Sequence, residues 1–557
     1  MKSNFKENQM LSHGAYIMLF TAILTKLIGA LFKIPLSQDY CLGDLGFGYF
    51  SAAYDLYTPI STLAISGFPL AISRIIASYI AQNKYAEIKE AFRCSKKILL
   101  IISIVEFVVI AIIIVPFSKL TDTTGNGIYS LIAILPTVVI SSVISLYRGY
   151  FEGFSNMKPP AISNIIEALG KLILGFSFAI ITLKLTHNVA FAAAAALFGI
   201  SVGLFVSTLY IFKKYRKDIK GIDFENYSLK EDFDKKFLYK KIFSVIVPVG
   251  LASLAGSFVV LIDTLTVRAQ LTFAMGTNSS FFSYIYRPLI EETNITKIEF
   301  LPTVLYGIKG KAFTLFNIII TLAMSLGISA VPAVAKFKAQ NNKTEMINSA
   351  DSSLKITTMI CFPVAAGFIS VGSKIMSLLY GDGVSAQIGA KMLMIYGFAT
   401  VFAGVSIVLG NILQGMGAYS HVFRNIILGI LLKIILNFIL TEITVLNIYG
   451  CCFSTLICYI FIFTLHLITF YKNSNKLPCT SIFIKPFFAA IICGAVAYIG
   501  SNFSENKVIF LLWVLVSGIV YFVFLFVLKF FNPQDFEVLP FSQKLLNCEN
   551  SQKNDVF

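Results

Sequence analysis

Two lysines lie inside a long apolar run near the start of the chain, where a charged side chain is costly. The run extends from Tyr16 to Leu36 and is long enough to cross a bilayer, which takes roughly 20 residues. Lys26 and Lys33 are close to two helical turns apart, so both ammonium groups share one helix face. A charge near the bilayer centre costs about 2.5–3.5 kcal/mol and normally faces water or a polar partner. We therefore expect this stripe to line a cavity for an anion; the alternative is that Lys33 snorkels to the membrane surface.

Cations outnumber acids among the other charged residues of the predicted membrane spans. Lys309 and Lys311 open one span, and two residues turn a helix by about 200°, so at most one of them faces a given cavity. Lys433 has no acidic partner on its own helix turn, and Arg74 lies near a span end, where snorkelling and function are both open. The excess predicts a cavity that attracts anions, with phosphate or pyrophosphate as candidates. The candidate substrate-binding residues are Lys26, Lys33, Arg74, Lys309, Lys311 and Lys433.

Three acidic residues within the spans have separate interpretations. Glu106 has no cation nearby in the sequence, so it is a candidate for coupling to an ion or for a hydrogen-bonded structural role. Asp55 is a second candidate for ion coupling. Glu167 lies four residues before Lys171, which predicts a structural ion pair along one helix.

Composition places the chain among polytopic membrane proteins. It has 557 residues, of which 57% are hydrophobic and 13% charged, and soluble domains carry about a quarter charged residues. Its net charge of +16 is attributed to membrane topology, and no nucleic-acid partner is expected. There is no Walker loop and no H-E-x-x-H motif, which favours a transporter over an enzyme and predicts no cofactor. Cys451, Cys452, Cys458 and His466 resemble a metal cluster only in residue type; one apolar run contains them all, so buried packing is favoured and no metal is expected.

Apolar runs predict fourteen helical spans, and the bias of Lys and Arg puts both termini in the cytoplasm. A polar and aromatic outer loop is expected at 264–301, either as a cap or as a variable insertion. The spans are expected at 14–36, 48–80, 97–117, 127–148, 160–184, 188–212, 241–263, 302–335, 354–380, 388–413, 422–441, 446–471, 482–501 and 507–530. The expected domains are an N-terminal lobe at 1–212, a basic cytoplasmic linker at 213–241, a C-terminal lobe at 242–471, two final spans within 472–531 and a cytoplasmic tail at 532–557.

The two halves of the chain repeat each other. Gly153 matches Gly415 and Lys171 matches Lys433, both at an offset of 262 residues. The stretch Phe68 to Arg74 also resembles Val331 to Lys336. Spans one to six and seven to twelve are therefore expected to form two pseudo-symmetric lobes around a central cavity, an architecture of transporters.

Four stretches resemble the family of stage V sporulation protein B: Gly29 to Ala77, Ser145 to Gly175, Leu305 to Lys336 and Leu409 to Asn437. That family is related to the lipid II flippases and belongs to the multidrug/oligosaccharidyl-lipid/polysaccharide (MOP) flippase superfamily. The resemblance implies a fourteen-helix fold with alternating access. The implied cargo is an undecaprenyl-pyrophosphate-linked precursor of peptidoglycan or spore cortex, moved to the outer leaflet of the cell membrane.

The same resemblance implies roles for particular residues. Lys26 and Lys33 occupy places similar to first-span cations that bind pyrophosphate, and Lys309 or Lys311 lies near a cationic position of span eight. The family's arginine early in span two has no counterpart between Asp55 and Ala64. Spans thirteen and fourteen are implied to form a groove for the lipid tail. Membrane lipids and cell-wall synthases are the other implied partners.

Three other functions stay open. A flippase for another precursor, such as a teichoic, capsular or exopolysaccharide unit, fits the same residues. A cation-coupled multidrug exporter of the same superfamily would need acidic residues in its lumen, and Asp55 and Glu106 are the candidates. A scaffold for wall synthesis that transports nothing is less compatible with the set of intramembrane lysines.

Overall fold

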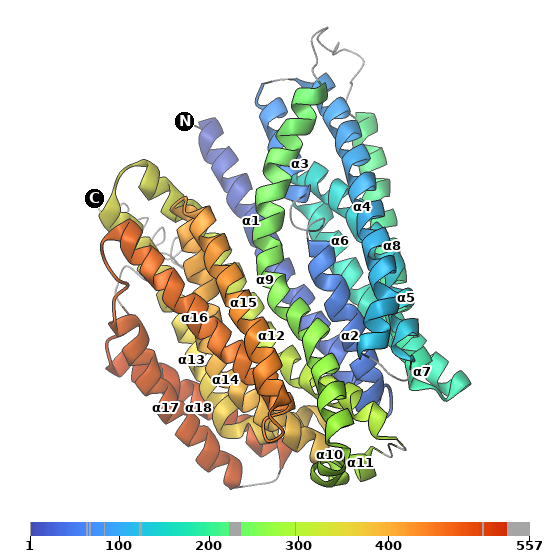
Figure 1. Cartoon of the computed structure of the whole chain (residues 1–557). Coiled ribbons are helices and arrows are strands. Elements are labelled where there is room, and N and C mark those ends of the chain that lie inside the picture. Colours follow the sequence, from blue (N-terminus) through green and yellow to red (C-terminus); the bar gives the residue numbers. More distant parts are fainter. Residues whose placement is uncertain are drawn as a thin grey trace. The chain divides into compact units, whose positions relative to one another are not determined.

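The chain is all-helical in the part that the structure describes. The structure is a computed structural model, and it describes residues 2–62, 65, 68–82, 84–121, 125–221, 235–293, 295, 297–503 and 506–531. No strand occurs among these residues, and long helices account for most of them (Figure 1). The expected tail at 532–557 and part of the expected linker, 222–234, lie outside the described residues.

The helices up to residue 221 include two interruptions at predicted spans. The second predicted span consists of two helices, α2 and α3, and the fifth contains a π-helical turn, η2, that begins at Lys171. The elements are α1 (Lys2–Leu36), α2 (Gly43–Thr62), α3 (Phe68–Ile80), α4 (Tyr85–Thr121), α5 (Gly127–Gly153), α6 (Lys158–Gly170), η2 (Lys171–Gly175), α7 (Phe176–Thr186) and α8 (Val189–Gly221).

The remaining helices correct the expected outer loop at 264–301. Helix α9 continues to Thr277 where the sequence pattern predicted an end at 263, and short helices follow it. The elements are α9 (Lys235–Thr277), α10 (Ser279–Ile285), α11 (Arg287–Glu292), η3 (Ile298–Phe300), α12 (Leu301–Ala339), α13 (Lys343–Tyr380), α14 (Val384–Gly415), α15 (Tyr419–Glu442), α16 (Ile448–Ser474), α17 (Ser481–Asn502) and α18 (Lys507–Val527).

Twelve helices of the described part are long and apolar enough to cross a membrane. They correspond to predicted spans three to fourteen; predicted spans one and two fall on α1 and on α2 with α3, which are not among the twelve. Within the described residues the exact count of fourteen is therefore not confirmed, although twelve is close to it. Helix α1 carries Lys26 and Lys33, and α2 carries Asp44 and Asp55.

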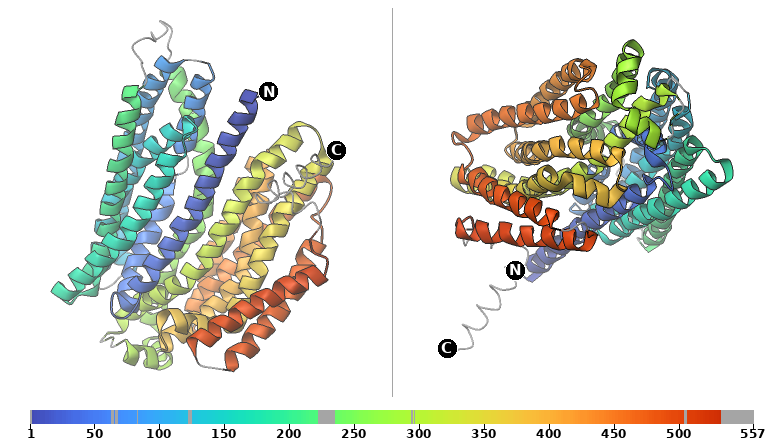
Figure 2. Two further views of the ribbon diagram at one scale, coloured as in Figure 1. Left: turned by 180° about the vertical axis from the view of Figure 1, so that it is seen from behind. Right: turned by 90° about the horizontal axis from the view of Figure 1, so that it is seen from below.

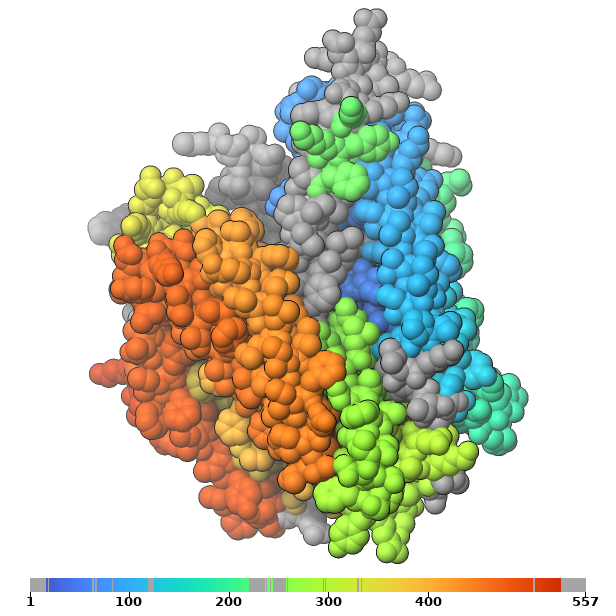
Figure 3. All heavy atoms as spheres, in the orientation of Figure 1, coloured from blue at the N-terminus to red at the C-terminus, as the bar shows by residue number. Residues whose placement is uncertain are grey.

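Exposed apolar stripes on single helices agree with a lipid environment. Such stripes repeat every three to four residues, the spacing of one helix face. A water-soluble protein would have to cover so large an apolar surface. Helix α4, blue in Figure 3, exposes Ile101, Ile104, Val105, Val108, Ile112 and Val115, and α18 exposes Val508, Leu511, Leu512, Leu515, Ile519, Phe522 and Phe526. The chain is a multi-pass membrane protein of the all-α class.

The chain forms two compact units, each assembled from separated segments. Unit 1 comprises Met1–Ile318, Leu379–Met392 and Phe423–Cys458; unit 2 comprises Ile319–Leu378, Leu393–Val422 and Tyr459–Phe557. In unit 1, α5 packs against α3, α4 and α8, and α1 packs against α6 and η2. In unit 2, α17 and α18 lie side by side, as both views in Figure 2 show. The two lobes stay a prediction, because they are defined by repetition in the sequence, whereas the two units are defined by compact packing.

The repeated glycines occupy comparable positions within their own units. A Cβ atom added at Gly153 would lie 2.7 Å from the Cβ atom of Ile76 on α3, so α5 and α3 need a glycine to approach closely. At Gly415 of α14 it would lie 3.0 Å from the carbonyl oxygen of Val331 on α12. Helix α3 contains Phe68 to Arg74 and α12 contains Val331 to Lys336, which are the stretches paired by the repeat. The repeated stretches therefore lie in two comparable helix pairs, α3 with α5 and α12 with α14, and each pair has a glycine at its contact.

Candidate substrate-binding site

Five of the six candidate cations, all but Arg74, fall into a sealed group and an accessible group within unit 1. Lys309, Lys311 and Lys433 have side chains exposed by 1%, 2% and 0%. Lys26 is exposed and Lys33 is half-buried, although both were predicted on the same stripe. Only the second group can meet a ligand in this conformation without first separating buried ion pairs.

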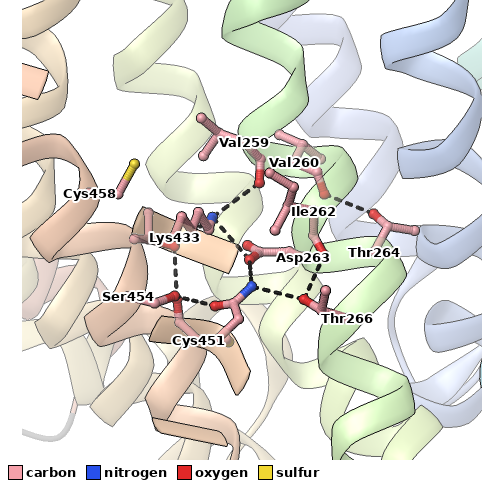
Figure 4. Close-up of polar contacts among 12 residues, drawn as sticks. Val259, Val260, Ile262, Asp263, Thr264, Thr266, Lys433, Cys451, Ser454 and Cys458 are labelled. Carbon is pink, nitrogen blue, oxygen red and sulfur yellow. Dashed lines mark hydrogen bonds and ion pairs between the residues drawn. The ribbon is translucent and has the colours of Figure 1, made fainter. Parts of the chain in front are cut away.

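Two lysines of the sealed group, Lys309 and Lys433, share the carboxylate of Asp263 on α9, and Figure 4 shows Asp263 with Lys433. Lys433 of α15 lies 2.9 Å from Asp263 Oδ1, and Lys309 of α12 lies 3.1 Å from Oδ2. Lys433 Nζ also donates to the carbonyl oxygen of Val259 at 3.1 Å and to Thr455 Oγ1 at 3.0 Å. Asn437 donates to Asp263 Oδ1 at 3.0 Å. Two ammonium groups thus share one carboxylate, and the oxygens around Lys433 meet the requirement that a buried charge be paired and hydrogen-bonded.

Lys311 points to a different partner from Lys309, as the 200° helical turn predicted. Its Nζ lies 2.6 Å from Asp44 Oδ1 on α2. The two helices touch closely there, since a Cβ atom at Gly307 would lie 2.0 Å from the carbonyl oxygen of Asp44. The pair therefore ties α2 to α12 at a contact with no room for an additional side chain.

The accessible group surrounds Tyr54 of α2. Lys33 Nζ lies 4.7 Å from the centroid of the Tyr54 ring, a cation–π distance. Lys26, Lys33 and Lys171 all interact electrostatically with the Tyr54 hydroxyl. The predicted stripe on α1 is thus extended by a lysine from η2, a helix on which α1 packs.

Lys171 forms the predicted ion pair with Glu167, and a second cation shares that carboxylate. Lys171 Nζ lies 2.5 Å from Glu167 Oε1, and Arg148 Nη2 lies 2.8 Å from Oε2. Arg148 is fixed further by a 2.9 Å hydrogen bond from its Nε to Ser163 Oγ. These side chains are partly accessible, with exposed fractions of 25% for Lys171, 18% for Glu167 and 12% for Arg148.

The three remaining candidate residues, Arg74, Asp55 and Glu106, have different surroundings. Arg74 is exposed on α3. Asp55 accepts a 3.2 Å hydrogen bond from the hydroxyl of Tyr306 on α12. Glu106 is buried in α4, where Oε2 accepts a 3.3 Å hydrogen bond from Ser142 and Oε1 has no hydrogen-bond partner among the described residues.

Sequence reasoning missed the acids that seal the lysines and the arginine that shares Glu167. Asp263 was placed at a span end and Asp44 before a span, so neither was weighed as an intramembrane charge. Arg148 was placed at the limit of the fourth predicted span. A longer predicted span would have included Asp263. Because α9 continues to Thr277, Asp263 and the buried Arg268 both lie on a spanning helix.

One motif with the pattern G-x-S-x-G, from Gly199 to Gly203, has a structural explanation. It lies in the middle of α8, where Ser201 is buried and its hydroxyl contacts that of Thr137. A Cβ atom at Gly199 would lie 2.6 Å from Gly175, and one at Gly203 would lie 2.7 Å from Gly170. The glycines let two membrane helices approach, and the strand-to-helix turn of a hydrolase nucleophile does not occur there.

The cysteines and histidine considered for a metal have protein partners. Cys451 donates to the carbonyl oxygen of Ile448 at 3.0 Å, and Cys458 to that of Gly429 at 3.3 Å. His466 Nδ1 lies 3.0 Å from the carbonyl oxygen of Ser406. Among the described residues, no three His, Cys, Asp or Glu side chains are grouped so as to hold a metal ion.

Unit 2 contains an apolar cavity of about 720 Å³. It lies among α13, α14, α16 and α17, and phenylalanines from all four helices line it. Ser370 is the one hydroxyl-bearing residue of the lining, which is Phe362, Ala365, Ala366, Ile369, Ser370, Phe398, Val401, Phe402, Val405, Phe463, Phe483, Ile484, Phe487, Ala490, Ile491 and Gly494. Such a lining suits a hydrocarbon chain.

Comparison with known proteins gives two family matches and two relatives that cover most of the chain. The polysaccharide biosynthesis protein family matches residues 11–289, and the MatE family matches residues 307–439. Stage V sporulation protein B of Bacillus subtilis is 25% identical over 552 residues, which cover 96% of this chain and 98% of that protein. Lipid II flippase MurJ of Bacillus subtilis is 22% identical over 441 residues, covering 77% of this chain and 76% of the flippase.

The fold is shared with a solved flippase. A structure of lipid II flippase MurJ in an inward closed conformation superposes with a TM-score of 0.65 and 16% identity, covering 91% of this chain and 97% of that one. The likeness to stage V sporulation protein B and to this flippase structure extends over more than nine-tenths of the chain. The chain therefore belongs to the polysaccharide biosynthesis protein family, whose model matches half of its residues.

Proposed function

We propose that the protein moves an undecaprenyl-pyrophosphate-linked precursor of peptidoglycan or spore cortex to the outer leaflet of the membrane by alternating access. The sugar headgroup and diphosphate pass through the protein while the polyprenyl chain stays in lipid. Both termini lie in the cytoplasm in this proposal, as the distribution of Lys and Arg indicates.

The observation that carries the proposal is the accessible lysine group around Tyr54. Lys26, Lys33 and Lys171 lie close enough to act on one tyrosine hydroxyl. The carboxylates that act on these lysines include Glu167 and Asp55, and both have other partners, Arg148 and Tyr306. A diphosphate carries enough negative charge to offset several ammonium groups at once, and ammonium groups bind phosphate as point charges. Lysine makes looser contacts than arginine, which suits a carrier that must release its cargo.

The same group argues against a cationic drug as the cargo. A cation would be repelled by the three lysines, and like charges in a partly desolvated site cost several kcal/mol. Other lipid-linked glycans with the same diphosphate remain compatible, because the proposed contacts concern the diphosphate and leave the sugar undetermined.

The hydrocarbon part of the cargo has a matching environment in unit 2. The cavity among α13, α14, α16 and α17 offers apolar surface from aromatic and aliphatic side chains. Because the prenyl chain comes from lipid and not from water, the cavity would hold it through packing contacts and would gain no hydrophobic free energy. This supports a lipid-tail role for the region that includes α17, as expected for the final spans.

Flipping of fluorescent lipid II in proteoliposomes tests the proposal. The wild-type protein is compared with the variant Lys26→Ala plus Lys33→Ala. The matched control is Lys96→Ala plus Lys97→Ala, which removes two charges from exposed positions of α4. We expect transport by the wild type and the control, and loss of transport in the Lys26 and Lys33 variant at equal folded yield.

Other results redirect the assignment. Equal flipping by all three proteins would mean that the lysines of α1 are structural and that the diphosphate site lies elsewhere. Absence of flipping in the wild type, together with transport of another lipid-linked glycan, would replace lipid II as the cargo. Export of a cationic drug that depends on Asp55 or Glu106 would overturn the proposal in favour of a multidrug exporter.

A further inference from the structure

Glu167 carries two cations, although one would be enough to neutralise it. Arg148 and Lys171 approach opposite oxygens of its carboxylate, at 2.8 Å and 2.5 Å. Arg148 is held independently by its bond to Ser163, and Glu152 acts on it from one turn further along α5. Lys171 is the less constrained member of the pair, because within the described part of the chain its ammonium group donates a hydrogen bond to Glu167 alone.

Lys171 can leave Glu167 without stranding a buried charge. The carboxylate would keep its bond to Arg148, so the penalty for breaking a buried pair would fall only on the ammonium group. That group is accessible to a ligand, since a quarter of the Lys171 side chain is exposed. Lys433, the repeat-related lysine, has an exposed fraction of 0% and three polar partners, Asp263, the Val259 carbonyl and Thr455, so it has no such freedom.

The backbone under Lys171 is also unusual. The π-helical turn η2 begins at this residue and interrupts what would otherwise be one helix, α6 with α7. π-Helical turns are frequent at functional sites, because the extra residue reorients side chains and weakens the regular hydrogen-bond ladder. Lys171, the first residue of this turn, acts electrostatically on Tyr54, as do Lys26 and Lys33 of α1.

From these contacts we infer that Glu167 is an internal competitor for the cargo: it holds Lys171 in the empty protein, and the diphosphate takes its place when cargo binds. Lys171 then becomes a third cationic contact beside Lys26 and Lys33, while Glu167 remains paired with Arg148. When the cargo leaves, the carboxylate recaptures the lysine, which favours release. The identity of the cargo in this inference rests on the proposed function. Inorganic pyrophosphate should displace Glu167 from Lys171 in the same way.

Binding of inorganic pyrophosphate to the full-length purified protein tests the inference by calorimetry. We expect Glu167→Gln to bind about ten-fold more tightly than the wild type, because Lys171 is no longer held by a charge. Lys171→Gln should bind about ten-fold more weakly, and Lys171→Arg should stay within about two-fold of the wild type. The double variant should equal Lys171→Gln, because Glu167 acts on the ligand through Lys171.

A matched control is the exposed pair of Arg287 and Glu291, which has the same spacing of four residues at 2.9 Å. Glu291→Gln removes the same charge and should leave pyrophosphate binding unchanged. If Glu167→Gln does not fold, the comparison of Lys171→Gln with Lys171→Arg still decides. Equal binding by the wild type and Lys171→Gln overturns the inference, as does tightening by Glu167→Gln that persists without Lys171.

The lipid II assay separates this inference from the proposed function. The predicted order of pyrophosphate affinities without any lipid II flipping would retain the competitor role of Glu167 and reject the proposed cargo. Flipping by the wild type with no effect of Glu167 or Lys171 on pyrophosphate affinity would reject the competitor role alone.

Discussion

Replacement of Asp263 by asparagine is expected to destabilise the protein more than removal of either lysine that it binds. In Asp263→Asn, Lys309 and Lys433 keep their charges and lose the carboxylate that they share. In Lys433→Met, one cation disappears, and Asp263 keeps Lys309 at 3.1 Å and Asn437 at 3.0 Å. The first change leaves two unpaired buried charges, whereas the second leaves one balanced pair.

The magnitudes follow from the distances. At about 3 Å and an effective dielectric constant of about 20, each lysine attracts the carboxylate by about 5.5 kcal/mol. Removal of one partner of a buried pair costs about 3–5 kcal/mol after relaxation, and here one change affects two pairs, so we expect at least that range for Asp263→Asn. Lys433→Met instead leaves the Val259 carbonyl and the Thr455 hydroxyl without their donor, which costs about 1–3 kcal/mol.

Thermal unfolding in detergent, followed by size-exclusion chromatography of the remaining folded fraction, measures this order. Asp382→Asn is the control, because Asp382 is exposed and its replacement should change stability by less than about 0.5 kcal/mol. A Lys433→Met variant that unfolds at the same temperature as Asp263→Asn, or below it, would refute the view that Asp263 is the shared counter-charge of the network.

Two further predictions concern packing and orientation. Gly307→Ala should lower the unfolding temperature markedly, because its Cβ atom would lie 2.0 Å from the carbonyl oxygen of Asp44. Gly518→Ala is the control and should be neutral, because a Cβ atom there has nothing within 4 Å. The same unfolding assay compares the two variants, and equal midpoints would contradict the close contact at Gly307. A membrane-impermeant maleimide at pH 8 should label the exposed Cys479 from the cytoplasmic side only. It should not label Cys41 from either side, because Cys41 is buried and burial raises the pKa of its thiol to about 11. Labelling of Cys479 from outside would reverse the predicted orientation.

Local features of the sequence were sufficient to predict most of the spanning helices and to place Lys26 and Lys33 on α1. Twelve predicted spans coincide with long apolar helices, because the length of an apolar run is a property of the chain itself. The shared face of Lys26 and Lys33, the opposed directions of Lys309 and Lys311, and the Glu167–Lys171 pair all follow from the angle of a helical turn.

The limits of α9 show where the same reasoning failed. Asp263, Thr264 and Arg268 made the apolar run look finished at 263, yet the helix continues to Thr277. All three side chains are buried, and Asp263 and Thr264 contact groups on other helices. Hydropathy counts such residues as polar because it cannot include partners that are distant in the sequence.

Lys171 and Lys433 make the same point for the candidate site. The repeat assigns them equivalent positions, and nothing in their own helices predicts that one is accessible and the other sealed. The difference comes from Asp263, which is 170 residues away from Lys433 in the sequence and 2.9 Å away from it in the fold. The sequence alone therefore determined which residues carry charge inside the membrane and which helix face they occupy, since both depend on local geometry. The tertiary structure decided which of those charges are neutralised, since that depends on carboxylates that other helices bring within bonding distance.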